Sequence, residues 1–176
     1  MHRPYLFTSL RLGFRQWQPS DVAPMAAINA DKEVMEYIPG VQTYSQTEAF
    51  VVRMRQQQEE KGYCYYAIDE LANGAFIGFI GLSQQTYASE YTPCVDVGWR
   101  LARPAWGRGY AREGAKRCLL YGHNDLGMEQ ILAIAPQVNV RSLHVMEKAG
   151  MTRVGSFIHP LLMNDERLKK CVVYRS

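Results

Sequence analysis

The glycine-rich segment Trp106–Ala111 constrains the fold more than any other part of the chain, because two different patterns meet there. Before it, Cys94–Leu101 alternates between two faces and is predicted to be a strand. After it, small and apolar residues recur at helical spacing on one face: Ala111, Ala115, Cys118, Leu119 and Gly122. The segment is therefore predicted to be a tight turn from a strand into an amphipathic helix that begins near Tyr110.

Such a turn is a candidate anion-binding site. A helix N-terminus offers unpaired backbone N–H groups and the positive end of the helix dipole, which together suit a pyrophosphate. Gly107 and Gly109 would let the backbone approach the ligand, and Arg108 adds a positive charge whose partner is a phosphate or solvent. A strand-to-helix turn that needs glycine only for its dihedral angles explains the same pattern equally well.

Two other phosphate motifs are excluded. The chain has no G-K-[S/T] sequence, and the third glycine position of G-x-G-x-x-G is occupied by Arg112. A dinucleotide-binding fold also places its motif after the first strand of a parallel unit, whereas antiparallel strands are predicted before this one. Asn73-Gly74, a strong hairpin signal, connects two of those strands, Tyr63–Asp69 and Phe76–Leu82.

Strand and helix patterns continue along the whole chain, with no linker or repeat, so residues 1–176 are predicted to form a single domain. Pro19-Ser20-Asp21 supplies one helix start. Ser45 and Glu48 form a capping-box pattern at the start of another helix, which Gly62 ends. Outside residues 94–122 the predicted elements are strands at 10–17, 63–69, 76–82, 130–135, 152–158 and 170–174 and helices at 20–29, 45–61 and 139–150.

Charge and composition exclude several classes of protein. The net charge of +3 comes without a run of like charges, so a nucleic-acid binder is not expected and the excess suits an anionic cofactor. The four cysteines form no C-x-x-C pair and the four histidines no H-E-x-x-H pair, so no metal is expected. No apolar run reaches the ~18 residues of a membrane span. Without a secretory signal, the protein is expected in the cytoplasm with reduced thiols.

Four motifs, in this order, resemble those of the GNAT acetyltransferases: Val97-Gly-Trp-Arg-Leu101, Trp106-Gly-Arg-Gly-Tyr-Ala111, Asn139-Val-Arg-Ser142 and Lys148-Ala-Gly-Met151. The branch that they resemble most contains the ribosomal-protein N-terminal alanine and serine acetyltransferases. The resemblance implies an α+β (mixed α/β) GNAT fold, in which helices cover both faces of a twisted, mostly antiparallel sheet of six to seven strands. It also implies acetyl-CoA as co-substrate and an amine as acceptor.

The resemblance assigns the cofactor to the turn and to the strand before it. The family's pyrophosphate loop reads Gln or Arg, x, x, Gly, x, Gly or Ala, and Gly109 and Ala111 fill its last two places. Free backbone groups of the strand are expected to bind the pantetheine arm. Asn139 matches an asparagine that hydrogen-bonds the cofactor, and it can also cap the following helix. The implied cofactor-binding residues are Trp99, Leu101, Trp106, Gly107, Arg108, Gly109, Tyr110, Ala111 and Asn139.

Ser142 and Asp96 are the candidate catalytic residues. The tyrosine that serves as the acid elsewhere in the family lies seven residues after the asparagine, where this chain has Met146. Ser142 resembles the serine proposed for that role in the nearest branch, and the alternative is a surface or capping serine. Asp96 stands near a family glutamate that takes a proton through water, and strand alternation turns it toward either the acceptor cleft or solvent. An amine with a low pKa, such as a chain N-terminus at ~7.7–8.0, needs less help from a base.

The acceptor is expected between three segments, residues 31–45, 84–93 and 159–170. These segments carry tyrosines and glutamates that can hold a cationic amine or simply cover an ordinary surface: Tyr37, Tyr44, Tyr87, Tyr91, Glu33, Glu36 and Glu90. A peptide N-terminus and a small amine both stay open as acceptors. The alternative function is a coenzyme A-binding sensor or docking module without turnover. A monomer or homodimer is expected, with no nucleic acid or membrane partner.

Overall fold

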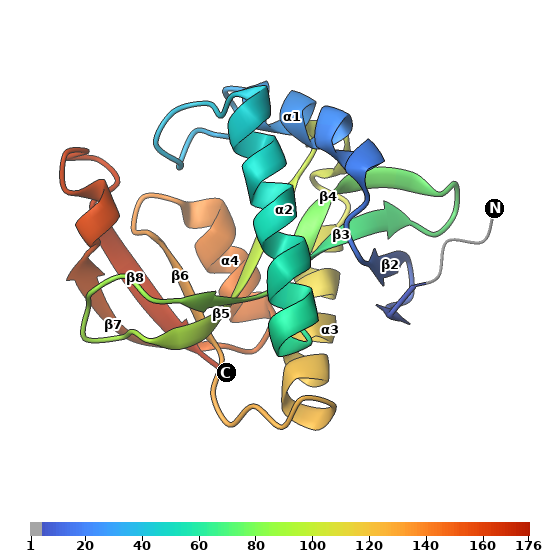
Figure 1. The fold of residues 1–176 in the computed structure, drawn as a ribbon. Helices are drawn as coiled ribbons and strands as arrows, with labels where there is room; N and C mark the ends of the chain where they lie inside the picture. Colours follow the sequence, from blue (N-terminus) through green and yellow to red (C-terminus); the bar gives the residue numbers. More distant parts are fainter. Residues whose placement is uncertain (1–4) are drawn as a thin grey trace.

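The computed structural model describes residues 5–176 and contains one sheet of eight strands in the order β1-β2-β3-β4-β5-β6-β8-β7 (Figure 1). Every neighbouring pair is antiparallel except β5 and β6, which are parallel, so the predicted, mostly antiparallel sheet is confirmed. The strands are β1 (Phe7–Thr8), β2 (Leu12–Arg15), β3 (Tyr65–Glu70), β4 (Ala75–Gln85), β5 (Cys94–Leu101), β6 (Leu132–Pro136), β7 (Thr152–Ile158) and β8 (Lys170–Arg175).

The eighth strand arises because the predicted strand at residues 10–17 is shorter than expected and pairs with a preceding one. A turn separates the two, in which the Ser9 backbone N–H donates to the Leu12 carbonyl at 2.9 Å. The side chain of Leu10 stands on this turn and is 88% exposed. The apolar alternation that suggested one strand through Leu10 therefore includes a turn residue.

Helices cover both faces of the sheet, as predicted. They are α1 (Val22–Ala30), α2 (Tyr44–Lys61), α3 (Tyr110–Asn124) and α4 (Val140–Lys148), with short 3-10 turns at Pro19–Asp21, Arg103–Ala105 and Pro160–Leu162. In Figure 1, α2 crosses in front of the sheet while α3 and α4 lie behind it. Consecutive residues of β4 show why: Phe79 packs on Phe50 of α2 at 5.2 Å between ring centroids, whereas Ile80 packs on Gly114 of α3, where an added Cβ would lie 2.2 Å from the Ile80 Cδ1.

The start of α2 differs from the prediction. The N-cap is Thr43, whose hydroxyl accepts from the Gln46 N–H at 3.2 Å, while the Gln46 side chain accepts from the Thr43 N–H at 2.8 Å. The capping box is therefore formed by Thr43 and Gln46, and the prediction of Ser45 and Glu48 is wrong. Both quartets satisfy the same sequence rule two residues apart, so local pattern alone cannot choose between them. Gly62 ends the helix in the left-handed region, with φ at 79°, as expected.

Arg15 of β2 is buried between two carboxylates, with 1% of its surface exposed. Its Nε and Nη2 donate to Asp69 of β3 at 2.8 and 2.9 Å, and its Nη1 and Nη2 donate to Asp21 at 2.7 and 2.9 Å. Burial by itself lowers the pKa of an arginine, but here both carboxylates oppose it and the pKa of Arg15 is raised. Both edges of the guanidinium are occupied, which ties β2 to β3 and to the turn before α1.

The strands β5 and β6 diverge directly after they meet. They pair at one position, Asp96 with Leu132, whereas β5 and β4 pair along their whole common length, from Cys94 with Gln85 to Leu101 with Gly78. On its β6 side, β5 therefore has backbone groups without a strand partner beyond Asp96. Within residues 5–176, no helix is both long and apolar enough to cross a membrane.

Candidate active site

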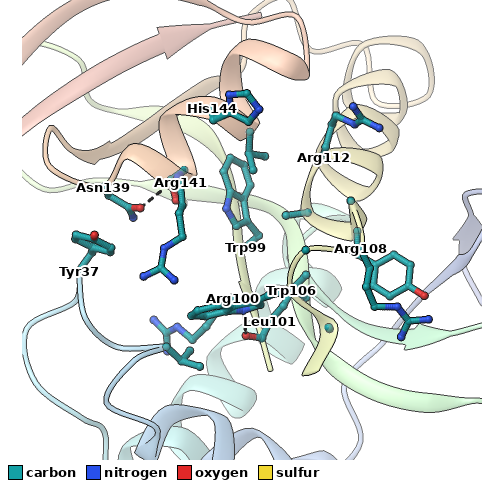
Figure 2. A pocket seen from close by; sticks show the side chains of 18 of the residues that line it. Tyr37, Trp99, Arg100, Leu101, Trp106, Arg108, Arg112, Asn139, Arg141 and His144 are labelled. Atoms are coloured by element: carbon teal, nitrogen blue, oxygen red, sulfur yellow. Dashed lines mark hydrogen bonds between the residues drawn. The ribbon is translucent and has the colours of Figure 1, made fainter. Parts of the chain in front are cut away.

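A cavity of about 870 Å³ lies where β5 and β6 diverge, enclosed by the segment after α1, the turn into α3 and one face of α4 (Figure 2). The residues predicted to bind the cofactor, together with Ser142, all line it: Trp99, Leu101, Trp106, Gly107, Arg108, Gly109, Tyr110, Ala111, Asn139 and Ser142. Asp96 does not. The structure thus brings two segments that are far apart in the chain, residues 99–111 and 139–142, around one cavity.

The turn into α3 has the geometry of an anion cradle. Gly107 and Gly109 have φ values of 71° and 79°, which are left-handed, and Gly109 is the N-cap of α3 without any side-chain cap. A Cβ added at Gly107 would meet no atom within 4 Å. The first N–H groups of α3 therefore carry no capping side chain, and the backbone beside them is open to a ligand.

Arg108 has a carboxylate partner within the chain. Its Nη2 donates to Glu70 at the end of β3 at 2.6 Å, a partner that the sequence did not indicate, and the side chain is 48% exposed, so a phosphate partner stays a prediction. The Tyr110 hydroxyl donates to the same Glu70 oxygen at 2.5 Å. The hydrogen bond from Tyr110 lowers the pKa of Glu70 the most, and the one from Arg108 lowers it further. Arg108 thus holds the turn against the sheet. The guanidinium groups of Arg11 and Arg112 approach Gly109 instead, 3.5 and 3.9 Å from the place of a Cβ.

Trp106 also fixes the turn. Its indole Nε1 donates to the carbonyl of Leu101 at 2.8 Å, and the Arg141 guanidinium lies 4.5 Å above its ring. One carbonyl of the strand expected to bind the pantetheine arm is therefore already used. The side chain of Trp99 faces the cavity from β5, beside His144 of α4 (Figure 2).

Asn139 caps α4: its Oδ1 accepts from the backbone N–H of Ser142 at 3.1 Å (Figure 2). The capping alternative for Asn139 is thus correct, and the residue also lines the cavity. Ser142 stands half-buried in the first turn of α4, and among residues 5–176 its hydroxyl has no hydrogen-bond partner. Met146, one turn further, is 2% exposed and belongs to the core.

Asp96 points neither to the cavity nor to solvent, contrary to both alternatives expected for it. It is 9% exposed, and its Oδ1 accepts from the Tyr65 hydroxyl at 2.6 Å and from Gln85 Nε2 at 3.1 Å. Burial raises the pKa of Asp96 to about 6, although both hydrogen bonds act against this. The reason for the burial is tertiary, because the Tyr65 ring lies over Gly98 on the same face of β5.

Of the tyrosines and glutamates expected around the acceptor, Tyr37 and Glu33 line the cavity. Glu33 pairs with Arg103 at 2.7 Å, and Glu36 pairs with Arg141 at 2.6 Å, so these carboxylates already have cationic partners. The others lie elsewhere in the described chain: Tyr44, Tyr87, Tyr91 and Glu90. Tyr87 and Tyr91 instead form an aromatic cluster with Phe157 of β7.

Several lining residues were not assigned from the sequence: Arg100, Arg112, Val140, Arg141, His144, Val145 and Lys148. Those on α4 follow helical spacing, with Arg141, Val145 and Lys148 at intervals of four and three residues. That periodicity was readable once Asn139 was placed at the start of the helix. The position of Arg100 carried no such signal. Residues 5–176 hold no cluster of side chains suited to a metal ion.

Comparisons with known proteins agree on one family. A model of the acetyltransferase (GNAT) domain matches residues 11–152. The chain is 33% identical to the protein YkkB of Bacillus subtilis over 123 residues, which is 69% of each chain. It is 27% identical to the FsC-acetyl coenzyme A-N(2)-transacetylase of Aspergillus fumigatus over 139 residues, 75% of this chain and 58% of the relative.

Solved structures give the same result. A GNAT-family acetyltransferase of Bacillus anthracis superposes with a TM-score of 0.79 and 27% identity over 96% of each chain. The ribosomal-protein-S5-alanine acetyltransferase of Vibrio fischeri has a TM-score of 0.76 and 15% identity, covering 97% of this chain and 94% of that one. The spermidine N-acetyltransferase of Vibrio cholerae, in complex with CoA and spermine, has a TM-score of 0.74 and 15% identity, covering 94% and 95%. The last two likenesses concern the fold alone.

Proposed function

The chain belongs to the GNAT acetyltransferase family, and we propose that it transfers the acetyl group of acetyl-CoA to a primary amine by direct attack in a ternary complex. Family membership confirms the predicted fold class. One observation carries the proposal: the start of α3, which has glycines and no side-chain cap, lines the same cavity as β5, where that strand diverges from β6. The predicted ribosomal-protein branch stays a prediction, because a polyamine acetyltransferase shares the fold to a similar degree.

The cavity suits coenzyme A in charge and shape. A pyrophosphate would accept from the N–H groups of the first turn of α3, beside Gly109, and the basic side chains of Arg112 and Lys148 line the same space. On the β6 side of β5, backbone groups near Trp99 have no strand partner and would bind the amide groups of the pantetheine arm. A thioester brought by this arm would lie between β5 and α4.

The reaction forms a bond between the amine nitrogen and the acetyl carbon and breaks the carbon–sulfur bond. The amine must lose a proton, and the departing thiolate, whose parent pKa is ~8.5, gains one. Ser142 is the proposed donor to the thiolate, supported by its place in the cavity and its unpaired hydroxyl within the described chain. Asp96 is the proposed base, acting through Tyr65 or a water. Its pKa of about 6 suits that role, and its burial argues for a relayed proton rather than direct contact.

A second candidate function is binding of coenzyme A without turnover. It is favoured by Met146, which stands buried at the position of the family's tyrosine acid.

The four cysteines are all free thiols, which supports a reducing compartment such as the cytoplasm for either function.

Calorimetric titration with acetyl-CoA, followed by thiol release with pooled amines and N-terminal peptides, tests the proposal. Micromolar binding with release from one pool is expected. Binding without release from any pool would favour the sensor function. Absence of binding would show that the turn at Gly107 and Gly109 needs glycine for its dihedral angles alone.

A further inference from the structure

Arg100 has no carboxylate partner within residues 5–176. Its register partner in β4 is Phe79, and its Cζ lies 5.4 Å from that ring, so the side chain is on the face covered by α1 and α2. Nη1 donates to Asn29 Oδ1 at 2.6 Å and to Gln42 Oε1 at 3.4 Å. Both acceptors are neutral amide oxygens, which leave the charge of the guanidinium uncompensated.

Arg15 provides an internal comparison. Both edges of its guanidinium meet carboxylates. In Arg100, Nε is buried without a hydrogen-bond partner, and no partner for Nη2 is found in the described part of the chain. Removing a guanidinium from water without a counter-charge costs free energy. Arg100 is half-buried with its Nε fully covered, so the fold carries part of that cost, and a bound anion would offset it.

The two arginines also differ in acidity. Burial lowers the pKa of Arg100 to about 10, although the nearby Tyr65 acts in the opposite direction. At Arg15, two carboxylates outweigh the same effect of burial. The difference follows from the partners and agrees with an anion site that this chain does not itself fill.

Arg100 lines the cavity at the side farther from the glycine turn. Its neighbours Trp99 and Leu101 alternate to the other face of β5, toward α3 and α4. Figure 2 shows the Arg100 side chain extending away from the glycine turn, toward the segment between α1 and α2. The phosphates of the cofactor are proposed to bind at Gly109, on the α3 side. An anion at Arg100 would therefore belong to the acceptor.

We propose that the acceptor is an amine that also carries a carboxylate, and that Arg100 binds this carboxylate. The inference rests on the proposed function, because it names the second substrate of that reaction. One carboxylate oxygen would accept from Nη2, and the other would replace the 3.4 Å contact of Gln42 with Nη1. Asn29 holds the guanidinium in position, since its Nδ2 donates to Thr47 at 2.9 Å and leaves Oδ1 for Arg100.

The same wall offers little to a polycation. Within the described residues, Glu33 is the acidic side chain of the cavity lining, and it is already paired with Arg103. Glu36 is paired with Arg141. An acceptor carrying several positive charges and no negative one would meet Arg100 without an unpaired carboxylate to offset it.

The first test is binding to the CoA-loaded protein, which does not depend on turnover. The probes are α-, β- and γ-amino acids, each with its carboxamide, and short peptides with an acidic residue at the N-terminus. At least one carboxylate compound is expected to bind roughly 10- to 100-fold more tightly than its amide, as a charged hydrogen-bonded pair implies. Equal affinity of every acid and its amide, or binding of none of the probes, would overturn the inference.

Variants assign the effect to Arg100. Arg100→Gln is expected to reduce the preference for the acid to within about threefold, and Arg100→Lys to restore part of it. Arg55→Gln, at an exposed arginine of α2, is the matched control and should leave the preference unchanged. A preference that survives Arg100→Gln would place the carboxylate elsewhere and refute the assignment. Acetyl-CoA affinity, measured in parallel, shows that each variant is folded.

Thiol release with the preferred acid separates this inference from the proposed function. Release supports both. Binding of the acid through Arg100 without release would refute the acetyltransferase proposal and leave the carboxylate site standing. Release with neutral amines alone would support the acetyltransferase and refute the carboxylate site.

Discussion

Replacing Asp96 with asparagine is expected to change the free energy of unfolding in a pH-dependent way. The difference between variant and wild type should favour the variant more at pH 8 than at pH 4. Both hydrogen bonds to this side chain end on Oδ1, from the Tyr65 hydroxyl at 2.6 Å and from Gln85 Nε2 at 3.1 Å. An asparagine oxygen at the same place accepts both. The substitution therefore removes the charge of a buried carboxylate and keeps its two donors.

The magnitude follows from the raised pKa of Asp96. The folded protein holds this proton with a pKa of about 6, against an ordinary value of 3.8, because burial disfavours the carboxylate. Stability is therefore greatest while Asp96 is protonated and falls as pH rises from about 4 through about 6. At about 1.4 kcal/mol for each pH unit, the difference corresponds to about 3 kcal/mol. The variant lacks this penalty, so its advantage should grow by about 2.5 kcal/mol between pH 4 and pH 8, because the remainder of the wild-type loss falls below pH 4.

Urea unfolding of the wild type and Asp96→Asn at pH 4, 6 and 8 measures this change. A constant offset of about 1 kcal/mol is expected at every pH, because the new amide N–H groups are buried too. The test is therefore the slope with pH. Asp125→Asn, at an exposed aspartate, is the control and should show no such slope. A pH-independent difference for Asp96→Asn would refute the assignment. Turnover of the same variant tests the proposed base separately, since a base predicts loss of rate despite the gain in stability.

Three further predictions concern the cofactor site, the acid and the core. Gly109→Glu should weaken acetyl-CoA binding by ~100-fold or more in calorimetry, because a side chain and a negative charge enter the cradle. The control Gly74→Glu, at a hairpin glycine with a similar φ of 70°, should leave the affinity unchanged. Equal losses of affinity in the two variants would point to backbone strain. Ser142→Ala should lower kcat by ~10²-fold with acetyl-CoA affinity nearly intact, whereas wild-type turnover would leave water as the proton donor. Arg15→Met should cost about 3–5 kcal/mol in urea unfolding, because two buried carboxylates lose their partner, and a loss below about 1 kcal/mol would contradict this account.

Local features of the chain were predicted well from the sequence. The Asn73-Gly74 hairpin, the amphipathic helix after the glycine turn and the cap at Asn139 depend on residues within a few positions of one another. The start of α2 was missed by this same reasoning, because Thr43 with Gln46 and Ser45 with Glu48 satisfy one rule equally. Ranges of strands followed from apolar alternation, except where the exposed Leu10 of a turn continued the pattern.

The sequence by itself determined the order of the elements, because turn chemistry and helical period act over short distances along the chain. Its resemblance to the GNAT motifs implied part of the cavity lining. The tertiary structure alone decided what the charged side chains do there. Arg108 finds Glu70, Asp96 finds Tyr65, and Arg100 finds Asn29, at separations of 38, 31 and 71 residues. The partner of a charge depends on which strands lie side by side, and no local pattern encodes that choice. Burial then sets the cost of each pairing, and it leaves the half-buried Arg100 without a carboxylate partner among residues 5–176.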